Sequence, residues 1–511
     1  MSAHAQPDPA AAASGRLDRE LILVSVVVVL GAVLSILDAT VVNVAIPKLA
    51  QEFRTDLPTI QWTVTGYTLA LATVIPITGW AADRFGTKRL YAISIVLFVM
   101  GSTLAGAAWS AESLIAFRVL QGLGGGMIMP AGMTILTRAA GPHRVGRVMA
   151  IIGVPMLLAP IMGPILGGYL VDEVSWRWIF YINVPVGIVA VFAALKILPR
   201  DVPAPHHRLD WTGLALLSPG LALLIYGLAE SGSNGSFAHA EVIGPMVAGA
   251  ALLVAFVLHA RRDREPLIDL ELFRNRTFSV ASLALFAMVI SVFGGMLLLP
   301  LYLQTVRGES AFDTGLLLAP QGFGAMLAMP IAGQLTDRTG VGRIAPVGLV
   351  LVALSFLGLT QLTDDTSYWL LGAVLFLMGL GMGATMMPIM SGAMQTLRRA
   401  AVARASTTLN INQQVGASVG TAVLTVLLVH AISTRLPAGG GQGGFGEALP
   451  EDVRVQLAPL MAEAFGVTFW WALALVGIAF LAALALPKHK PEPLEEDPGA
   501  EDAAAPVLIA H

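Results

Sequence analysis

Long apolar segments constrain this chain more than any other feature of its sequence. A hydrocarbon core roughly 30 Å thick takes about 20 apolar residues per helix. Because an unpaired backbone group is costly in lipid, each segment is expected to cross the membrane as a helix. The sequence therefore predicts an all-α integral membrane protein with 14 transmembrane helices, at residues 21–43, 59–82, 90–108, 112–137, 148–171, 178–195, 211–229, 242–260, 277–304, 314–334, 344–362, 367–395, 405–431 and 464–486.

Composition agrees with a chain dissolved in lipid and excludes several kinds of site. Hydrophobic residues make up 56% of the chain and charged residues 12%, against roughly 25% charged residues in soluble domains. The absence of cysteine excludes disulfides, thiolate metal sites and cysteine nucleophiles. No lysine follows a glycine, which excludes the phosphate-binding loop of ATP-hydrolysing proteins. The net charge of -3 does not suggest a nucleic-acid partner, and we expect neither a metal nor a cofactor.

The distribution of Lys and Arg predicts an orientation, because these residues are retained on the cytoplasmic side during insertion. With the N-terminus inside, 23 of the 30 Lys and Arg fall in cytoplasmic loops or tails, 6 fall outside, and Arg118 lies within a span. A missed or invented helix would scramble this division. Both termini are therefore predicted to be cytoplasmic.

Three polar stretches lie between or beyond the spans. Residues 1–18 are rich in Ala, Pro and Asp and are predicted to be a disordered cytoplasmic tail. Residues 436–460 are rich in glycine with mixed charge, so we expect them to form the longest external loop. Residues 488–511 are acidic and are expected to form a second cytoplasmic tail.

One pattern, G-x-x-x-D-R-x-G-x-x-R, occurs twice, at Gly79–Arg89 and at Gly333–Arg343, 254 residues apart. Pro76 and Pro330 lie at the same distance before each aspartate. The first copy ends the second span and the second copy ends the tenth. A simple six-helix repeat would have matched the second span with the eighth, so two helices are predicted to be inserted between two six-helix halves.

This repeat predicts a division of the chain into three membrane parts. We expect an N-terminal half at residues 19–200, two inserted helices at residues 201–262, and a C-terminal half at residues 263–487. The inserted helices are the seventh and eighth apolar segments.

Asp38 is the only acidic residue deep within an apolar span. An ionised carboxylate costs about 2.5–3.5 kcal/mol at a helix centre on insertion scales, so its presence needs a reason. Low dielectric favours the neutral form, which would let Asp38 hold a proton in one state and release it, or face a cationic substrate, in another. The alternative is a structural hydrogen bond to a neighbouring helix. We favour the functional interpretation for Asp38, because ionisable groups inside the membrane usually belong to a transport pathway.

Three local sequences carry a family resemblance. Residues 37–47 read LDATVVNVAIP, residues 176–185 read WRWIFYINVP, and residues 114–124 carry L-x-x-x-R-x-x-Q-G-x-G. With the repeat and the span count, they resemble the major facilitator superfamily, and in particular its fourteen-helix drug:proton antiporter subfamily. The third sequence is similar to the superfamily's proton-coupling motif, although Gly125 and Gly126 replace its usual small-residue ending. The resemblance covers nearly the whole chain outside the two tails.

The resemblance implies a major facilitator fold in which two halves rock about a site near the midplane. It also assigns proton coupling to Arg118. A guanidinium does not deprotonate, so Arg118 would act on a neighbour rather than carry the proton itself. The alternative is that Arg118 is a structural link between helices.

The repeated pattern is expected to supply clasps that hold the cytoplasmic side shut. Each aspartate would pair with a basic residue or a helix end across the interface between the halves. The alternative is that the basic residues only fix topology, and both roles can hold together. These candidate gate residues are Gly79, Asp83, Arg84, Gly86, Arg89, Asp337, Arg338 and Gly340.

The fifth span resembles the antiporter motif of the family. Its small residues let another helix approach closely, and we interpret it as a tightly packed interface that seals against proton leak. Ala150 and Ala159 stand where the family usually has glycine, so the match is partial. The matching residues are Gly163, Pro164, Gly167 and Gly168.

Polar side chains in several spans are expected to point away from lipid. They could line a substrate cavity, or they could hydrogen-bond one helix to another. These candidate cavity residues are Asn43, Tyr67, Gln121, Gln304, Gln321, Asn410, Asn412, Gln413 and Gln414.

Together these expectations describe a monomeric secondary transporter of the cell membrane and not an enzyme. The proton gradient would drive export of small lipophilic, often cationic, compounds, with Asp38 and Arg118 as the coupling pair. One alternative keeps the carrier but changes the cargo, to an endogenous metabolite or lipid, or reverses it as a proton symporter. Another is a membrane sensor or channel, which the paired clasps disfavour. The sequence does not indicate whether an adaptor protein takes part.

Overall fold

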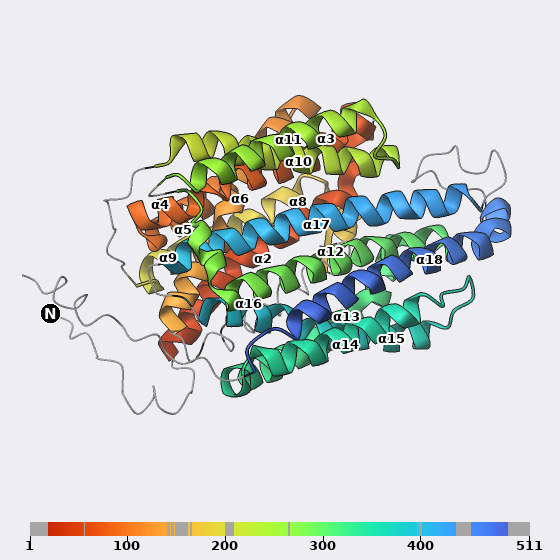
Figure 1. The fold of residues 1–511 in the computed structure, drawn as a ribbon. Coiled ribbons are helices and arrows are strands. Elements are labelled where there is room, and N and C mark those ends of the chain that lie inside the picture. The colour runs from red at the N-terminus through yellow and green to blue at the C-terminus, as the bar shows by residue number, and fades with distance from the viewer. Residues whose placement is uncertain are drawn as a thin grey trace, which may run out of the picture.

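The computed structural model describes residues 19–55, 57–140, 144, 148, 162–163, 166–199, 209–263, 266–395, 397, 401–435 and 451–488. Every regular element in these ranges is a helix, and most of the long helices run side by side as a bundle (Figure 1). Several predictions lie outside the described residues: the tail at 1–18, most of the span at 148–171 with Pro164, the chain at 436–450 and the tail from 489.

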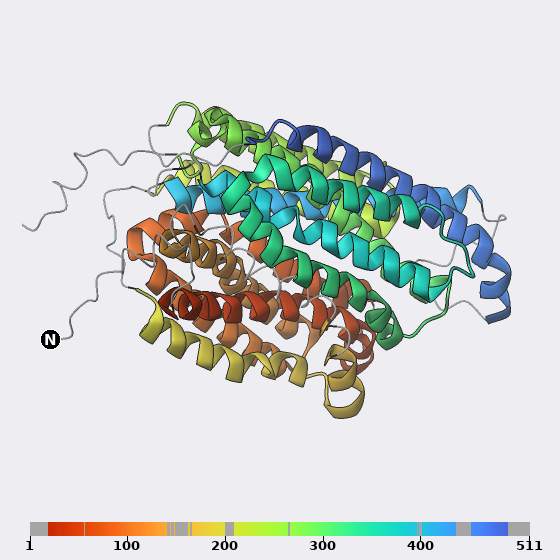
Figure 2. The same ribbon diagram turned by 90° about the horizontal axis from the view of Figure 1, so that it is seen from below.

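Two groups of helices make up the bundle, and a pair of helices separates them along the chain. Figure 2 shows the first group, coloured red to yellow, on one side and most of the second, green to blue, on the other. The first group comprises α2 (Arg19–Phe53), α3 (Leu57–Val74), α4 (Ile77–Phe85), α5 (Thr87–Gly106), α6 (Ala111–Ala140), the π-helical turn η1 (Leu170–Val174), α8 (Trp178–Tyr181) and α9 (Asn183–Ile197). The second comprises the short 3-10 helix η2 (Leu270–Arg274), α12 (Arg276–Thr305), α13 (Ala311–Thr339), α14 (Val341–Leu359), α15 (Tyr368–Gly383), α16 (Met386–Gln395), α17 (Val402–Ser433) and α18 (Glu451–Ala483).

Membrane-spanning helices account for nearly all of this bundle. Twelve helices of the described chain are long and apolar enough to cross a membrane, and a bent pair makes the number up to 13. These correspond to thirteen of the predicted spans. The remaining one, at residues 148–171, falls mostly outside the described residues, so the count of fourteen stays a prediction.

The predicted span at 59–82 is not one straight helix. Its two parts, Thr59–Val74 and Ile77–Phe85, meet at an angle of 56°. Pro76 stands at the break and has no N–H to continue the helical hydrogen bonds. The chain resumes at once, because Thr78 N donates to Ile75 O at 3.0 Å.

The last part of the predicted external loop is helical. The loop was predicted to run to residue 460, and residues 451–460 are the first turns of α18. Acidic residues favour a helix N-terminus, and the chain has Glu451 and Asp452 there. The apolar segment therefore begins inside a helix that has already started in a polar stretch.

The repeated pattern adopts one conformation in both copies. Gly86 has φ 86° and ψ 143°, and Gly340 has φ 89° and ψ 151°. Each glycine ends one helix and begins the next, in a region that a side chain rarely enters. The end of the bundle that carries Gly86 and Gly340 is called the loop end below.

The pair that follows the first group is α10 (Trp211–Asn234) and α11 (Ala240–Ala260), within the residues predicted to be an insert. α10 packs against α3 of the first group and α17 of the second. Ser218 Oγ donates to Thr73 O at 2.6 Å, and Trp62 stacks on Tyr226 with ring centroids 5.8 Å apart. The pair thus bridges the two groups, and its origin as an insert stays a prediction.

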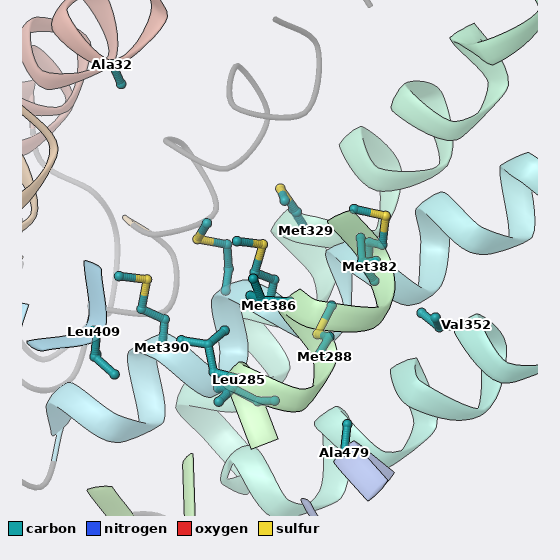
Figure 3. Close-up of a cluster of buried hydrophobic side chains, with 14 of the residues drawn as sticks. Ala32, Leu285, Met288, Met329, Val352, Met382, Met386, Met390, Leu409 and Ala479 are labelled. Atoms are coloured by element: carbon teal, nitrogen blue, oxygen red, sulfur yellow. The ribbon is translucent and has the colours of Figure 1, made fainter. Parts of the chain in front are cut away.

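Methionines concentrate in the core of the second group, as Figure 3 shows. Met288, Met329, Met382, Met386 and Met390 are each at most 5% exposed. They come from α12, α13, α15 and α16. Unbranched thioether side chains fill irregular gaps between helices, so this core can repack when the helices shift.

Candidate functional site

Asp38 and Arg118 form a buried ion pair between α2 and α6. Arg118 Nη1 donates to Asp38 Oδ2 at 2.5 Å, and neither side chain has any exposed surface. The sequence predicted a role for each residue, and the structure brings them together. A buried pair of this kind is costly to break, because removal of one member leaves the other charge unpaired in a low-dielectric interior.

The other carboxylate oxygen of Asp38 accepts two amide hydrogen bonds. Gln121 Nε2 donates to Asp38 Oδ1 at 2.9 Å, and Asn183 Nδ2 donates to the same oxygen at 2.8 Å. Gln121 also accepts from Arg118 Nη1 at 2.7 Å, which closes a ring of hydrogen bonds among three side chains. Both oxygens of the Asp38 carboxyl group are therefore hydrogen-bonded to side chains of the site.

The guanidinium of Arg118 is oriented by further contacts. Its Nε donates to Thr63 O at 3.1 Å, and its carbon lies 4.2 Å from the centre of the Tyr67 ring. The centre of the Phe180 ring lies 5.7 Å from the same guanidinium carbon. Nη2 is buried and has no hydrogen-bond partner among the described residues. These contacts use the planar, multi-donor shape of arginine, which lysine lacks.

Glycines let the backbone of α6, which carries Arg118 and Gln121, lie close to the neighbouring helices α3 and α5. A Cβ on Gly101 of α5 would lie 2.6 Å from the backbone of Gln121. A Cβ on Gly122 would lie 2.5 Å from Tyr67 O of α3. Real Cβ atoms essentially never approach so closely, so these helix contacts require glycine.

The described end of the fifth span contacts α2 beside Asp38. A Cβ on Gly163 would lie 2.1 Å from Thr40 Oγ1, and one on Gly167 would lie 3.1 Å from Val41 O. Gly168 has no atom of the described chain within 4 Å of such a Cβ. Close packing of Gly163 and Gly167 agrees with the predicted small-residue interface.

At the loop end, Asp83 pairs with Arg138 at the end of α6, 3.3 Å away. In the second copy, Asp337 accepts a hydrogen bond from Gln395 Nε2 of α16 at 3.0 Å. Each of these partners lies in the same group as its aspartate, and the expected pairing across the interface between the halves stays a prediction. Arg84, Arg89 and Arg338 are exposed.

Contacts between the two groups come from the helices beside these loops. A Cβ on Gly79 would lie 3.2 Å from Thr407 Oγ1 of α17. Ser406 Oγ of the same helix donates to Pro130 O of α6 at 3.1 Å. α17 thus packs against α4 and α6 toward the loop end.

Comparison with known proteins identifies the family. A model described as Major Facilitator Superfamily matches residues 28–421. The chain belongs to this superfamily. The "Multidrug resistance protein B homolog" of Mycobacterium tuberculosis is 43% identical over 496 residues, which are 93% of this chain and 92% of that protein. The "Multidrug export protein EmrB" of Haemophilus influenzae is 33% identical over 410 residues, 80% of each chain.

A solved structure agrees with the fold. The human organic anion transporter MFSD10 (TETRAN) aligns with a TM-score of 0.60, covering 90% of this chain and 100% of that chain, at 16% identity. This major facilitator protein is therefore a multi-pass protein of the cell membrane, and the resemblance seen in its sequence is confirmed.

The predicted cavity residues of this major facilitator protein separate into two sets. Tyr67 and Gln121 join the Asp38 site, whereas those of the second group bond elsewhere. Asn410 donates to Ser406 O within its own helix, and Asn412 donates to Ser282 O of α12. Gln321 donates to the sulfur of Met382, and Gln413 donates to the sulfur of Met390. Gln304 is exposed and Gln414 is partly buried. The side chain of Asn43 is outside the described part of the chain.

Three site residues had no role predicted from the sequence. Asn183 contacts the carboxylate directly, Ser102 accepts from Asn183 at 3.1 Å, and Thr63 supplies a backbone carbonyl to Arg118. Asn183 lies in the matched sequence at 176–185, and an amide in an apolar span was the available signal. A backbone acceptor such as Thr63 O leaves no signal in residue type.

Proposed function

We propose that this major facilitator protein is a proton-coupled exporter of lipophilic, often cationic, small molecules. The buried Asp38–Arg118 ion pair carries the proposal. It supplies an acidic group inside the membrane that can take a proton, and a fixed cation whose interactions change when it does. The printed names of the relatives, a multidrug resistance homolog and a multidrug export protein, favour a cargo of this class.

The charge of the pair explains how a proton and a cation can be exchanged. Asp38 and Arg118 together are neutral, and a proton on Asp38 leaves the positive charge of Arg118 uncompensated. A cationic cargo near the carboxylate and a proton on it therefore disfavour each other. Mutually exclusive binding to one carboxylate is the requirement for antiport.

Movement of the site can be transmitted through the helices that form it. Asp38 belongs to α2 and Arg118 to α6, and α6 packs against α17 of the second group. Loss of the ion pair would allow α2 and α6 to shift relative to each other. We propose that this shift biases the rocking of the two groups that exposes the site to one side at a time.

We assign the loop end to the cytoplasm, from the positions of the basic residues. With this orientation, the contacts of α17 with α4 and α6 lie toward the cytoplasmic side. Asp83 with Arg138 then fixes the ends of α4 and α6 to each other, so that they move together.

Reconstitution in liposomes with an imposed pH gradient tests the proposal. A fluorescent lipophilic cation should move against the direction of proton flow, and a protonophore should stop it. Unrelated lipophilic cations should compete with it. A dedicated exporter of one metabolite or lipid would resist this competition, and a symporter would move cargo in the same direction as the proton. Flux that ignores the gradient would refute proton coupling.

A further inference from the structure

The junction of α8 and α9 is tied to the proton site. α8 ends at Tyr181 and α9 begins at Asn183, with Ile182 between them. Ile182 keeps helical backbone angles, φ -60° and ψ -27°, and Pro185 cannot donate a hydrogen bond to the carbonyl of Tyr181, four residues earlier. Residues 176–183 are called the elbow below.

Four contacts attach the elbow to the site. Asn183 Nδ2 donates to Asp38 Oδ1 at 2.8 Å. The same nitrogen donates to Ser102 Oγ at 3.1 Å, and Ser102 Oγ in turn donates to Phe180 O at 2.9 Å. The Phe180 ring lies 5.7 Å from the guanidinium of Arg118. The elbow is thus held from both members of the ion pair.

The elbow also reaches the far end of α2. Trp176 and Phe180 are buried in a cluster with residues of α2, and Phe53 packs edge-on against Trp176 at 5.4 Å. Arg177 Nη1 lies 3.6 Å from Glu52 Oε1, one residue before α2 ends at Phe53. A change at Asp38 therefore has a continuous packed route to that end of the first group.

We propose that Asn183 is a positioning residue that couples the protonation of Asp38 to the elbow. An amide N–H bonds an ionised carboxylate more strongly than a neutral acid. A proton on Asp38 would weaken the bond from Asn183 and release one of the ties that hold the elbow. The inference rests on the proposed proton coupling and names the element that responds to it.

The first test is the pH dependence of transport by Asn183→Ala. Without the amide, the ionised form of Asp38 loses one donor, so the protonated form is favoured. The pH of half-maximal proton-driven flux should rise by about one unit, a roughly tenfold change in proton affinity, since charge-assisted bonds are worth this much or more. Ser291→Ala is the matched control, because it deletes a buried hydrogen bond between α12 and α18 without touching the site.

The second test measures the elbow directly. The chain has no cysteine, so spin labels can be placed at Trp178→Cys in α8 and Glu112→Cys in α6, both exposed. The distance between the labels should change with pH in the parent and in Ser291→Ala. It should be insensitive to pH in Asn183→Ala.

The outcomes separate this inference from the proposed function. If parent flux is driven by the proton gradient but Asn183→Ala keeps the parental pH profile and the parental change in label distance, Asn183 is not the coupling residue. If parent flux is indifferent to the gradient, the proposed function fails first. If Asn183→Ala does not fold, Ser102→Ala is the second variant. It removes the bonds of Ser102 to Asn183 and Phe180 but keeps the bond from Asn183 to Asp38, so it should shift the profile in the same direction by a smaller amount. An unshifted profile in that variant would overturn the inference.

Discussion

Arg118 Nη1 donates to Asp38 Oδ2 at 2.5 Å, although the two residues are 80 positions apart in the chain. The bond joins α2 to α6, and Gln121 and Asn183 complete the coordination of the carboxylate. One acid in an apolar helix is thus held by neighbours from two further helices. We propose that a proton on Asp38 would change the contacts that join these helices.

Replacement of Arg118 by Lys should impair transport despite the retained charge. Lysine cannot reach Thr63 O, Asp38 and Gln121 with one fixed fork of donors. Loss of even one charge-assisted bond, about 1.5–3 kcal/mol, should lower driven flux by roughly tenfold or more. Flux assays on protein matched for amount in the membrane measure this. Normal turnover would show that any cation suffices.

Gly101→Ala should destabilise the protein and reduce transport together. The new Cβ would lie 2.6 Å from the backbone of Gln121, and such overpacking costs about 1–3 kcal/mol. Gly477→Ala is the control, since no atom of the described chain lies within 4 Å of its Cβ. In detergent, the melting temperature of Gly101→Ala should be below that of the parent, and the melting temperature of Gly477→Ala should equal or exceed it. Equal melting of the two variants would contradict the packing described for α5 and α6.

Gly86→Ala and Gly340→Ala should have similar effects, because the two glycines share one conformation. Placing a residue with a Cβ in this sparsely populated backbone region, at φ 86° or 89° with extended ψ, costs about 1–3 kcal/mol. Gly232 provides a control without positive φ or close neighbours among the described residues. Melting temperatures of the three alanine variants check the prediction. A loss confined to one of the two loops would argue against equivalent roles.

Asp83→Asn should slow transport with little loss of stability. The pair with Arg138 is partly exposed, at 14% and 30% for the two side chains, and partly exposed pairs contribute only about 0.2–1 kcal/mol. The exchange Asp83→Arg with Arg138→Asp restores the pair in reverse. Flux in this double variant should exceed that of either single variant, and failure to do so would leave the aspartate with a different role.

Much of the fold could be predicted from the sequence, because lipid leaves few options for an apolar segment. The span positions and the repeat at Gly86 and Gly340 follow from residue type and spacing. Residue type also singled out Asp38, whereas the role expected for Arg118 came from the family resemblance. The bend at Pro76 and the early start of α18 were missed, since hydropathy reports burial in lipid and not helix continuity.

Contacts across the bundle were harder to predict. Asp83 has the expected kind of partner, but Arg138 lies in its own group, and sequence alone does not show which helix ends meet. Asn183 had no predicted role because its importance comes from the fold of α8 and α9 against Asp38. Asn412 and Gln413 of α17 bond to α12 and α16, which is the interhelical alternative that the sequence left open, whereas Asn410 bonds within its own helix.

The most direct test of the central claim is proton-driven flux through liposomes that contain Asp38→Asn. The variant keeps the size of the side chain and cannot take or release a proton. We expect flux driven by a pH gradient to fall to that of protein-free liposomes, while exchange of cargo at equal pH on both sides persists. Gradient-driven flux equal to that of the parent would contradict the assignment of Asp38 as the proton-coupling residue.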